Sequence, residues 1–213
     1  MSTVILIPIF PLELVLFPGE KLNLHIFESR YRHLIQDVDQ HGIHFGIPFY
    51  QKGKEMTFGT TAALAEISKT HEDGKLDIKT IGQKVFRIHQ IHSTYKGCLY
   101  SGATVDFIEH IDEADITKAE ELSASVRQLY DLMKIDKPLP GFDDPHFSYK
   151  VGHHVGLSQN QELALLQIKH ETDRKIFLID HLKSLLPIVI EMEDLRRKIE
   201  MNGHFKNLKP PHF

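Results

Sequence analysis

Residues 8–31 read PIFPLELVLFPGEKLNLHIFESRY, a segment that combines turn, strand and helix signals in close succession. Two prolines, Pro11 and Pro18, bracket an apolar run. Pro18 and Gly19 together are typical of a turn, because proline presets φ and glycine accepts a positive φ. Apolar and polar residues then alternate over 22–26, which predicts a half-buried strand.

This strand leads directly into a helix that we expect over residues 27–40, with Gly42 as its stop signal. Spacings of three and four place four side chains on one buried face: Tyr31, Leu34, Ile35 and Val38. Glu28 and Arg30 flank the strand–helix joint, where they could form an ion pair or a ligand site, and the ion pair is the stronger expectation. The aromatic spacing predicts that the unit is anchored in a core by Phe10, Phe17 and Phe27.

The rest of the first half is expected to consist of strands separated by short turns. Candidate strands cover residues 4–7, 43–49, 57–67, 76–81, 85–91 and 99–107. Asp73 and Gly74 supply the positive φ that a tight hairpin between two of these strands needs. Six or seven short strands predict a small closed or partly closed barrel, since closure removes exposed sheet edges.

The second half is expected to be helical. One apolar stripe runs along residues 116–133, and Ser158 with Gln161 forms a capping-box pattern at the start of another helix. Thr172 is the expected cap of a long helix that reaches about residue 201, with a kink or a break at Pro187. The fold class is therefore α+β, with a β-rich lobe (residues 1–110), a helical lobe (111–203) and a flexible tail (204–213).

Composition narrows the classes of function. The 213 residues carry a net charge of −4 at pH 7, so no overall basic field favours nucleic acid, and Cys98 is the only cysteine. The apolar run 4–10 contains Pro8 and is too short to cross a membrane. We therefore expect a cytoplasmic protein with no membrane partner.

Residues 8–31 also resemble the opening of the amino-terminal, substrate-binding domain of Lon-type proteases. The shared pattern is an apolar-Pro-Leu element, then Val-Leu-Phe-Pro-Gly, then Leu-x-Leu-x-Ile-Phe-Glu-x-Arg-Tyr. Weaker agreement continues in order to about residue 190, although Lys84-Val85 departs from the family's usual arginine and apolar pair. The residues that carry the motif are Pro11, Phe17, Pro18, Gly19, Phe27, Glu28, Arg30 and Tyr31.

The resemblance implies a PUA-like pseudo-barrel lobe packed on a helical lobe that ends in a long helix. It also implies a noncatalytic module that binds exposed apolar segments of client proteins, with a role as an adaptor or regulator of proteolysis as a further expectation. The expected partners are unfolded or extended protein segments, with a separate Lon-type protease and a second copy of the chain as further possibilities. RNA binding is the alternative, because PUA-like barrels often bind RNA, but Lys and Arg are scattered. A cereblon-type ligand pocket would need a tryptophan cage, and the chain has no tryptophan.

Peptide binding would require partly exposed aromatic side chains around a groove. The candidates are Phe45, Phe49, Tyr50, Tyr95 and Tyr100, although such residues more often belong to a core.

Metal or nucleophilic chemistry has little support in the sequence. The short-spaced histidine pairs 41/44 and 89/92 and the adjacent pair 153–154 are interpreted as structural, because i and i+3 in a strand point to opposite faces. Cys98 lacks a recognised catalytic neighbourhood and is expected to be a small apolar residue. We therefore expect no catalytic residues, no metal and no cofactor.

Loss of the Lon motor and peptidase activities is the first testable expectation. Gly53-Lys54 and Gly74-Lys75 are followed by Glu55 and Leu76 rather than Ser or Thr, so no phosphate-binding P-loop is present, and we expect no Ser–Lys peptidase domain. The purified chain should neither hydrolyse ATP nor cleave casein, even if family naming labels it an ATP-dependent protease. Steady turnover in a phosphate-release or labelled-casein assay would contradict this expectation.

Overall fold

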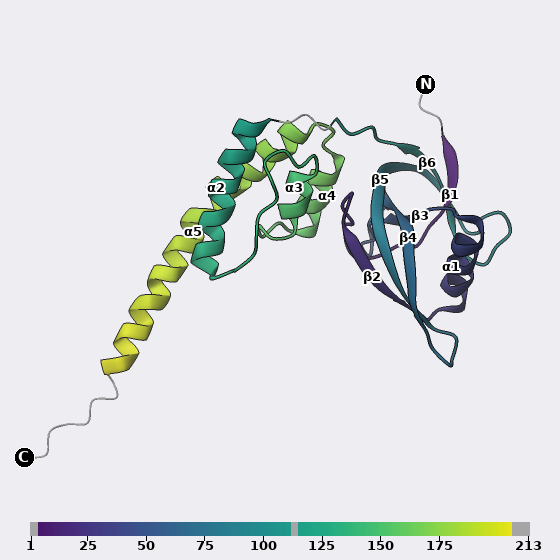
Figure 1. Ribbon diagram of the computed structural model, residues 1–213, viewed down its shortest axis with the longest axis horizontal. Helices are drawn as coiled ribbons and strands as arrows, with labels where there is room; N and C mark the ends of the chain where they lie inside the picture. Colours follow the sequence, from purple (N-terminus) through teal and green to yellow (C-terminus); the bar gives the residue numbers. More distant parts are fainter. Residues whose placement is uncertain (1–3, 112–114, 206–213) are drawn as a thin grey trace, which may run out of the picture.

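The computed structural model describes residues 4–111 and 115–205, which form a β-rich lobe and a helical lobe side by side (Figure 1). The β-rich lobe contains six strands and one helix. Their bounds are β1 (Ile5–Pro8), β2 (Lys21–Ile26), α1 (Ser29–His41), β3 (Phe45–Pro48), β4 (Phe58–Thr70), β5 (Leu76–His92) and β6 (Gly102–Phe107). The helical lobe contains α2 (Ile116–Met133), α3 (Phe147–Gly152), α4 (Gln159–Gln167) and α5 (Glu171–Phe205). The mixed α+β class predicted from the sequence is confirmed.

The strands form one antiparallel sheet in the order β1-β6-β5-β4-β3, and β2 also pairs with β5. The sheet closes on itself because the chain after β1 lies parallel to β3, where Phe10 N donates to the Gly46 carbonyl oxygen at 2.8 Å. Tyr50 N donates to the Leu12 carbonyl oxygen, also at 2.8 Å. β5 is the central strand, since its first half pairs with β2 and its second half with β6. Bulges along β4 and β5 allow the curvature that closure needs.

Helix α1 covers part of the barrel with the face that its spacing predicts. Its buried residues are Tyr31, Leu34, Ile35 and Val38, and Gly42 caps its carboxyl end at a φ of 61°. Phe10 packs against Tyr31, with ring centroids 4.1 Å apart. The sequence pattern therefore identified both the burial face and the end of this helix.

Three expectations about individual elements were wrong. Phe27 is 61% exposed, because period-2 alternation directs its neighbour Ile26 into the barrel and leaves Phe27 on the outer side. The strands expected at 76–81 and 85–91 are one continuous strand, β5, with Gly82 inside it. A Cβ at position 82 would lie 2.2 Å from the Phe17 carbonyl oxygen, so only glycine lets β5 pass this close to the turn. Helix α5 continues past Gly203 to Phe205, and residues 206–213 of the expected tail lie outside the described part of the chain.

The helical lobe has a core in which α2 and α5 pack together and the short helices α3 and α4 cover a further side of α5. Four residues of the β-rich lobe also belong to this core: Val15, Phe17, Phe49 and Val85. The predicted start of α4 is confirmed, since Ser158 and Gln161 form a complete capping box. Pro187 lies inside a single helix rather than between two. Helix α3 was not anticipated, because six residues are too few for a clear periodic pattern.

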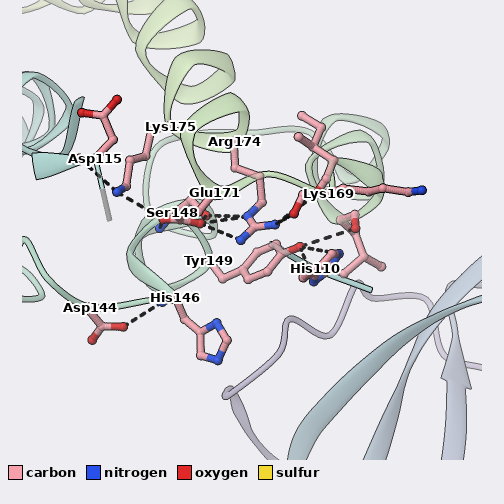
Figure 2. A network of polar contacts seen from close by, with 12 residues as sticks. His110, Asp115, Asp144, His146, Ser148, Tyr149, Lys169, Glu171, Arg174 and Lys175 are labelled. Carbon is pink, nitrogen blue, oxygen red and sulfur yellow. Dashed lines mark hydrogen bonds and ion pairs between the residues drawn. The ribbon is translucent and has the colours of Figure 1, made fainter. Parts of the chain in front are cut away.

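A buried polar network holds α3 against the start of α5 (Figure 2). Glu171 accepts hydrogen bonds from Arg174 Nε at 2.9 Å and from the Ser148 hydroxyl at 2.6 Å. Arg174 is fully buried, and its guanidinium lies 4.5 Å above the ring of Tyr149. Lys175 Nζ donates to the Asp115 carbonyl oxygen at 3.2 Å and lies 4.0 Å from Glu171.

The guanidinium of Arg174 is the centre of this network. Its Nη1 also donates to the carbonyl oxygens of Ile168 and Lys169, at 3.0 and 2.9 Å. These carbonyls lie in the α4–α5 connection, so one cation joins α3, α5 and the turn between α4 and α5. A charge taken out of water is stable only when it is paired and hydrogen-bonded in this way.

Replacement of Arg174 tests the importance of this network. Arg174→Met should lower the free energy of unfolding by about 3–5 kcal/mol, because it removes the cation closest to the buried Glu171 and leaves only Lys175, at 4.0 Å, to offset that charge. Urea unfolding followed by circular dichroism measures the change. Arg196→Met is the matched control on the same helix, since Arg196 pairs with Glu193 and Glu200 at the surface, and the cost there should be below about 1 kcal/mol. Equal costs for the two variants would contradict the proposed role of burial.

Candidate functional site

The Phe17-Pro18-Gly19-Glu20 turn forms the contact between the two lobes. Phe17 is buried, and its ring lies 4.9 Å from the ring of Tyr149 and 4.4 Å from that of His153, both in the helical lobe. Glu20 accepts a hydrogen bond from the backbone N–H of Phe17 at 2.9 Å, which closes the turn. Gly19 has a φ of 77°, the left-handed region that favours glycine. The segment singled out in the sequence is therefore a joint between lobes.

A cavity of about 170 Å³ lies at this joint. Its lining comes from the turn and from α3 with the residues after it: Phe17, Pro18, Gly19, Glu20, Tyr149, Lys150, His153 and His154. The approach of the lobes is close, because a Cβ on Gly152 would lie 2.9 Å from the Phe17 ring. The recess combines apolar groups such as Phe17 and Pro18 with the polar Glu20 and His153, and its volume suits a few water molecules rather than a peptide.

His153 carries the electrostatics of the joint. Its Nε2 lies 3.1 Å from Glu20 and its Nδ1 lies 2.7 Å from Glu162, so it connects the barrel to α4. Burial lowers the pKa of His153, but hydrogen bonds to Glu20 and Glu162 outweigh burial and leave the pKa above its ordinary value. For His154 the pKa is lowered, first by burial and then by the nearby Lys137 ammonium. The pKa values of two adjacent histidines are therefore shifted in opposite directions.

The other motif residues lie around the start of α1. Arg30 pairs with Glu28 at 2.8 Å at the protein surface, and its guanidinium lies 4.5 Å from the centre of the Tyr31 ring. Tyr31 is buried, while Phe27 is exposed beside His25. Pro11 precedes the second bridge of the barrel closure, at Leu12. These positions support the strand–helix joint and the closure of the barrel, which is a scaffolding arrangement.

The five aromatic residues expected to bind peptide do not share one surface. Phe45 belongs to the barrel core and Phe49 to the core shared with the helical lobe, and both are buried. Tyr95 and Tyr100 stack on each other at 5.7 Å and are also buried. Tyr50 is 37% exposed. Peptide binding by these residues stays a prediction, and a peptide could reach four of the five only after neighbouring groups move.

Tyr95 and Tyr100 nevertheless border a recess of about 430 Å³ between α1 and the β5–β6 loop. Its other lining residues are Asp37, His41, Ile43, Lys96 and Cys98. The Tyr100 hydroxyl donates to Asp37 at 2.6 Å, and its pKa is raised by burial and by that hydrogen bond. The hydroxyl is therefore a fixed donor rather than a base, and the recess offers a tyrosine wall with a single carboxylate.

A larger apolar surface lies on the second half of α5, and sequence reasoning did not single it out. The α3–α4 segment covers one face of α5 as far as Leu185, which lies 3.3 Å from the Cβ position of Gly156. Beyond Leu185 the same stripe continues without cover, at spacings of three and four, through Ile188, Met192, Leu195 and Ile199. Met192 and Leu195 are 65% and 59% exposed. The sequence contains a signal for this surface, because apolar residues at spacings of three and four continue along α5 beyond the part that packs in the core.

The basic residues considered for RNA binding lie at separate places in the described structure. Arg87 pairs with Asp106 at 3.2 Å, and Lys54 donates to Asn160. Lys84 lies over the Phe107 ring, and Lys96 over the Tyr95 ring. These cations come from different loops and strands, so the RNA alternative gains no support from a shared basic strip.

The structure thus consists of a barrel lobe closed on itself and a helical lobe that a Phe-Pro-Gly turn joins to it, with an uncovered apolar face on α5. The chain belongs to the family of the ATP-dependent protease La (LON) substrate-binding domain, whose model matches residues 6–188.

Solved structures agree with this assignment. The Lon N-terminal domain protein from Xanthomonas campestris has a TM-score of 0.66 at 24% identity, with 83% of this chain and 98% of that chain covered. The N-terminal domain of the Mycobacterium avium complex Lon protease has a TM-score of 0.63 at 15% identity, with 84% and 98% covered. At these identities the likeness establishes the fold. A comparison with curated proteins gave no match.

Among the helices of the described residues, none combines the length and the apolar character that a membrane crossing requires.

The opposite pKa shifts of His153 and His154 predict that substitutions of these residues change protein stability with opposite pH dependence. A histidine whose pKa is raised by folding stabilises the protein below its unfolded pKa of about 6.5 and loses that effect as pH rises through the folded pKa. The loss of unfolding free energy caused by His153→Gln should therefore be largest near pH 5.5 and should shrink towards pH 8.5. His154→Gln should show the reverse trend, because a lowered pKa makes protonation unfavourable to folding as pH falls. Urea unfolding across this range measures both, and parallel pH profiles for the two variants would contradict the assignment.

Proposed function

We propose that this chain is a noncatalytic module that binds exposed apolar segments of client proteins. Membership of the substrate-binding domain family supports binding of protein substrates. The uncovered stripe on α5 is the observation that carries the choice of surface. In this proposal the module works as an adaptor or regulator of proteolysis, with a separate Lon-type protease as the partner that acts on the client.

The stripe suits an apolar client because of what surrounds it. α2 packs on the opposite side of α5, where Leu186 is buried and Lys183 pairs with Glu121 at 3.2 Å. The stripe begins where α5 lies beside α2, and the last turns of α5 project beyond the rest of the lobe (Figure 1). Burial of a whole leucine, isoleucine or methionine side chain contributes roughly 1.5–3 kcal/mol, so four of them can support measurable affinity.

The chemistry of the stripe favours low sequence selectivity. Methionine is unbranched and polarizable, which lets Met192 adapt to apolar partners of different shapes. Charges of both signs flank the stripe, at Glu191, Arg196 and Lys198, so no single client charge is selected. These properties match the recognition of unfolded segments, which share apolar character rather than a common sequence. An amphipathic client segment could lie along the helix and present its own apolar side chains at the same spacing.

A double substitution on the stripe tests the proposal. Met192→Ser with Leu195→Ser should weaken binding to a permanently unfolded, fluorescently labelled client at least tenfold. A tenfold change corresponds to about 1.4 kcal/mol, which is less than the burial of even one of these side chains contributes. The affinity is measured by fluorescence anisotropy. The control is Asp194→Ser with Lys198→Ser, which makes the same replacement at exposed polar positions of the same helix and should leave the affinity unchanged. Circular dichroism confirms that both variants keep their helix.

Two outcomes would overturn the choice of surface. Equal binding by both double variants would show that clients bind elsewhere, and Tyr95 and Tyr100 beside their recess would be the next positions to substitute. A sedimentation mass that doubles with concentration in the wild-type chain, and stays monomeric in the Met192→Ser, Leu195→Ser variant, would assign the stripe to a second copy instead. Indifference of the wild-type chain between folded and unfolded clients would contradict the proposed function as a whole.

A further inference from the structure

Two histidines and an aspartate converge where β2 meets the β4–β5 hairpin. His25 Nδ1 lies 2.6 Å from Asp77 Oδ1, and His71 Nε2 lies 2.8 Å from Asp77 Oδ2. One ligand atom from each residue lies within 4.8 Å of the other two. We propose that His25, His71 and Asp77 bind a divalent transition-metal ion, with zinc as the best-fitting ion.

The backbone places the three ligands together. His25 and Asp77 are directly opposite in the antiparallel β2–β5 pairing, so their side chains share one face of the sheet. His71 is held at the base of the hairpin, where its N–H donates to the Lys75 carbonyl oxygen at 2.9 Å. Gly74 completes the turn at a φ of 79° and donates back to the His71 carbonyl oxygen. Because three hydrogen-bonded segments supply the ligands, binding orders only side chains.

The donor set selects the kind of ion. Two imidazole nitrogens and one carboxylate oxygen suit zinc and its neighbours, whereas magnesium and calcium prefer oxygen ligands. An aspartate side chain is ionised at neutral pH, so the Asp77 carboxylate, which both imidazoles already contact, is available as a ligand. Three protein ligands leave a further position for water, which fits the partial exposure of His25 and His71.

Small side-chain movements would convert the present geometry into coordination. Metal–ligand bonds of about 2.0–2.1 Å at tetrahedral angles separate ligand atoms by about 3.3 Å. The hydrogen-bonded pairs are closer than this, at 2.6 and 2.8 Å, so the ion would replace the shared protons and push the ligands slightly apart. Rotation of partly exposed side chains is enough for this change.

Other histidine–carboxylate groups in the described structure lack this arrangement. His89 lies 2.5 Å from Asp106, but the third group on that carboxylate is the Arg87 guanidinium, a cation that repels a metal ion. His153 contacts Glu20 and Glu162 through different ring nitrogens, which point in opposite directions, so one ion could not reach both carboxylates. At His25 and His71 two imidazoles face one carboxylate, and among the described residues no cationic side chain pairs with that carboxylate.

Metal binding would link β2 to the β4–β5 hairpin and so stabilise their association. β2 pairs with β5 alone among the described strands, and the hairpin tip projects from the barrel away from the helical lobe (Figure 1). An ion that binds the folded state raises stability by mass action and raises the melting temperature with ion concentration. This site is separate from the α5 stripe, so its test does not depend on the proposed function.

The experiment uses the full chain without a histidine tag. Zinc titration by calorimetry should give one site per chain, and cobalt should produce visible d–d absorption of a low-coordinate complex. His71→Asn and His25→Asn should each weaken zinc binding at least tenfold and remove the zinc-dependent rise in melting temperature. His89→Asn is the matched control, since it removes a histidine that also lies beside a carboxylate, and it should leave zinc affinity unchanged.

Several results would overturn the proposal. Unchanged zinc affinity in His71→Asn would do so, as would an equal loss in His89→Asn, which would indicate diffuse binding by a histidine-rich surface. A stoichiometry well above one with only millimolar affinity would have the same meaning. Melting curves without metal show whether His25→Asn and His71→Asn fold, and His71→Asn lies in a turn where loss of folding is least expected.

Discussion

Insertion of Phe17 between the lobes is the contact on which the architecture depends. Its ring belongs to the core of the helical lobe, while its backbone belongs to the barrel, where the Leu16 carbonyl oxygen accepts a 2.5 Å hydrogen bond from the Thr60 hydroxyl. The same turn requires small residues on both sides, because Gly82 passes against the Phe17 carbonyl and Gly152 against its ring. Phe17 and Phe49 of the β-rich lobe thus belong to the core of the helical lobe, and Phe17 packs directly on α3.

Local patterns predicted much of the fold because local physics governs those parts. The buried face of α1 and the capping box at Ser158 depend on residues three and four apart, and both were correct. The prediction that Phe27 anchors the core was wrong, because the direction of its side chain depends on which side of β2 faces the barrel. No sequence pattern indicates that Arg174 and Lys175 are buried. Their burial depends on carbonyl oxygens from other segments, those of Ile168 and Lys169 for Arg174 and that of Asp115 for Lys175.

The candidate sites were harder to predict than the fold for the same reason. His25 and Asp77 are opposite each other only because β2 pairs with β5 in one register, and a shift by one residue would separate their side chains onto two faces. The apolar stripe of α5 differs, because its spacing is visible in the sequence. What the sequence lacks is the point at which α3 and α4 stop covering it, near Leu185.

The two faces of α5 explain how one helix can stabilise a lobe and still present an apolar surface. Its first turns are committed to the core by the Glu171–Arg174 pair and by Leu178 and Leu182, so the helix is fixed before the stripe begins. A free helix with such a stripe would fray or bury it by collapse, since an isolated helix is marginal in water. Packing of α2 on the opposite side removes both outcomes, and the exposed residues then cost the fold little while remaining available to a partner. Family motifs at Phe17 and Tyr31 identify the scaffold, whereas the proposed recognition surface consists of residues that the scaffold leaves uncovered.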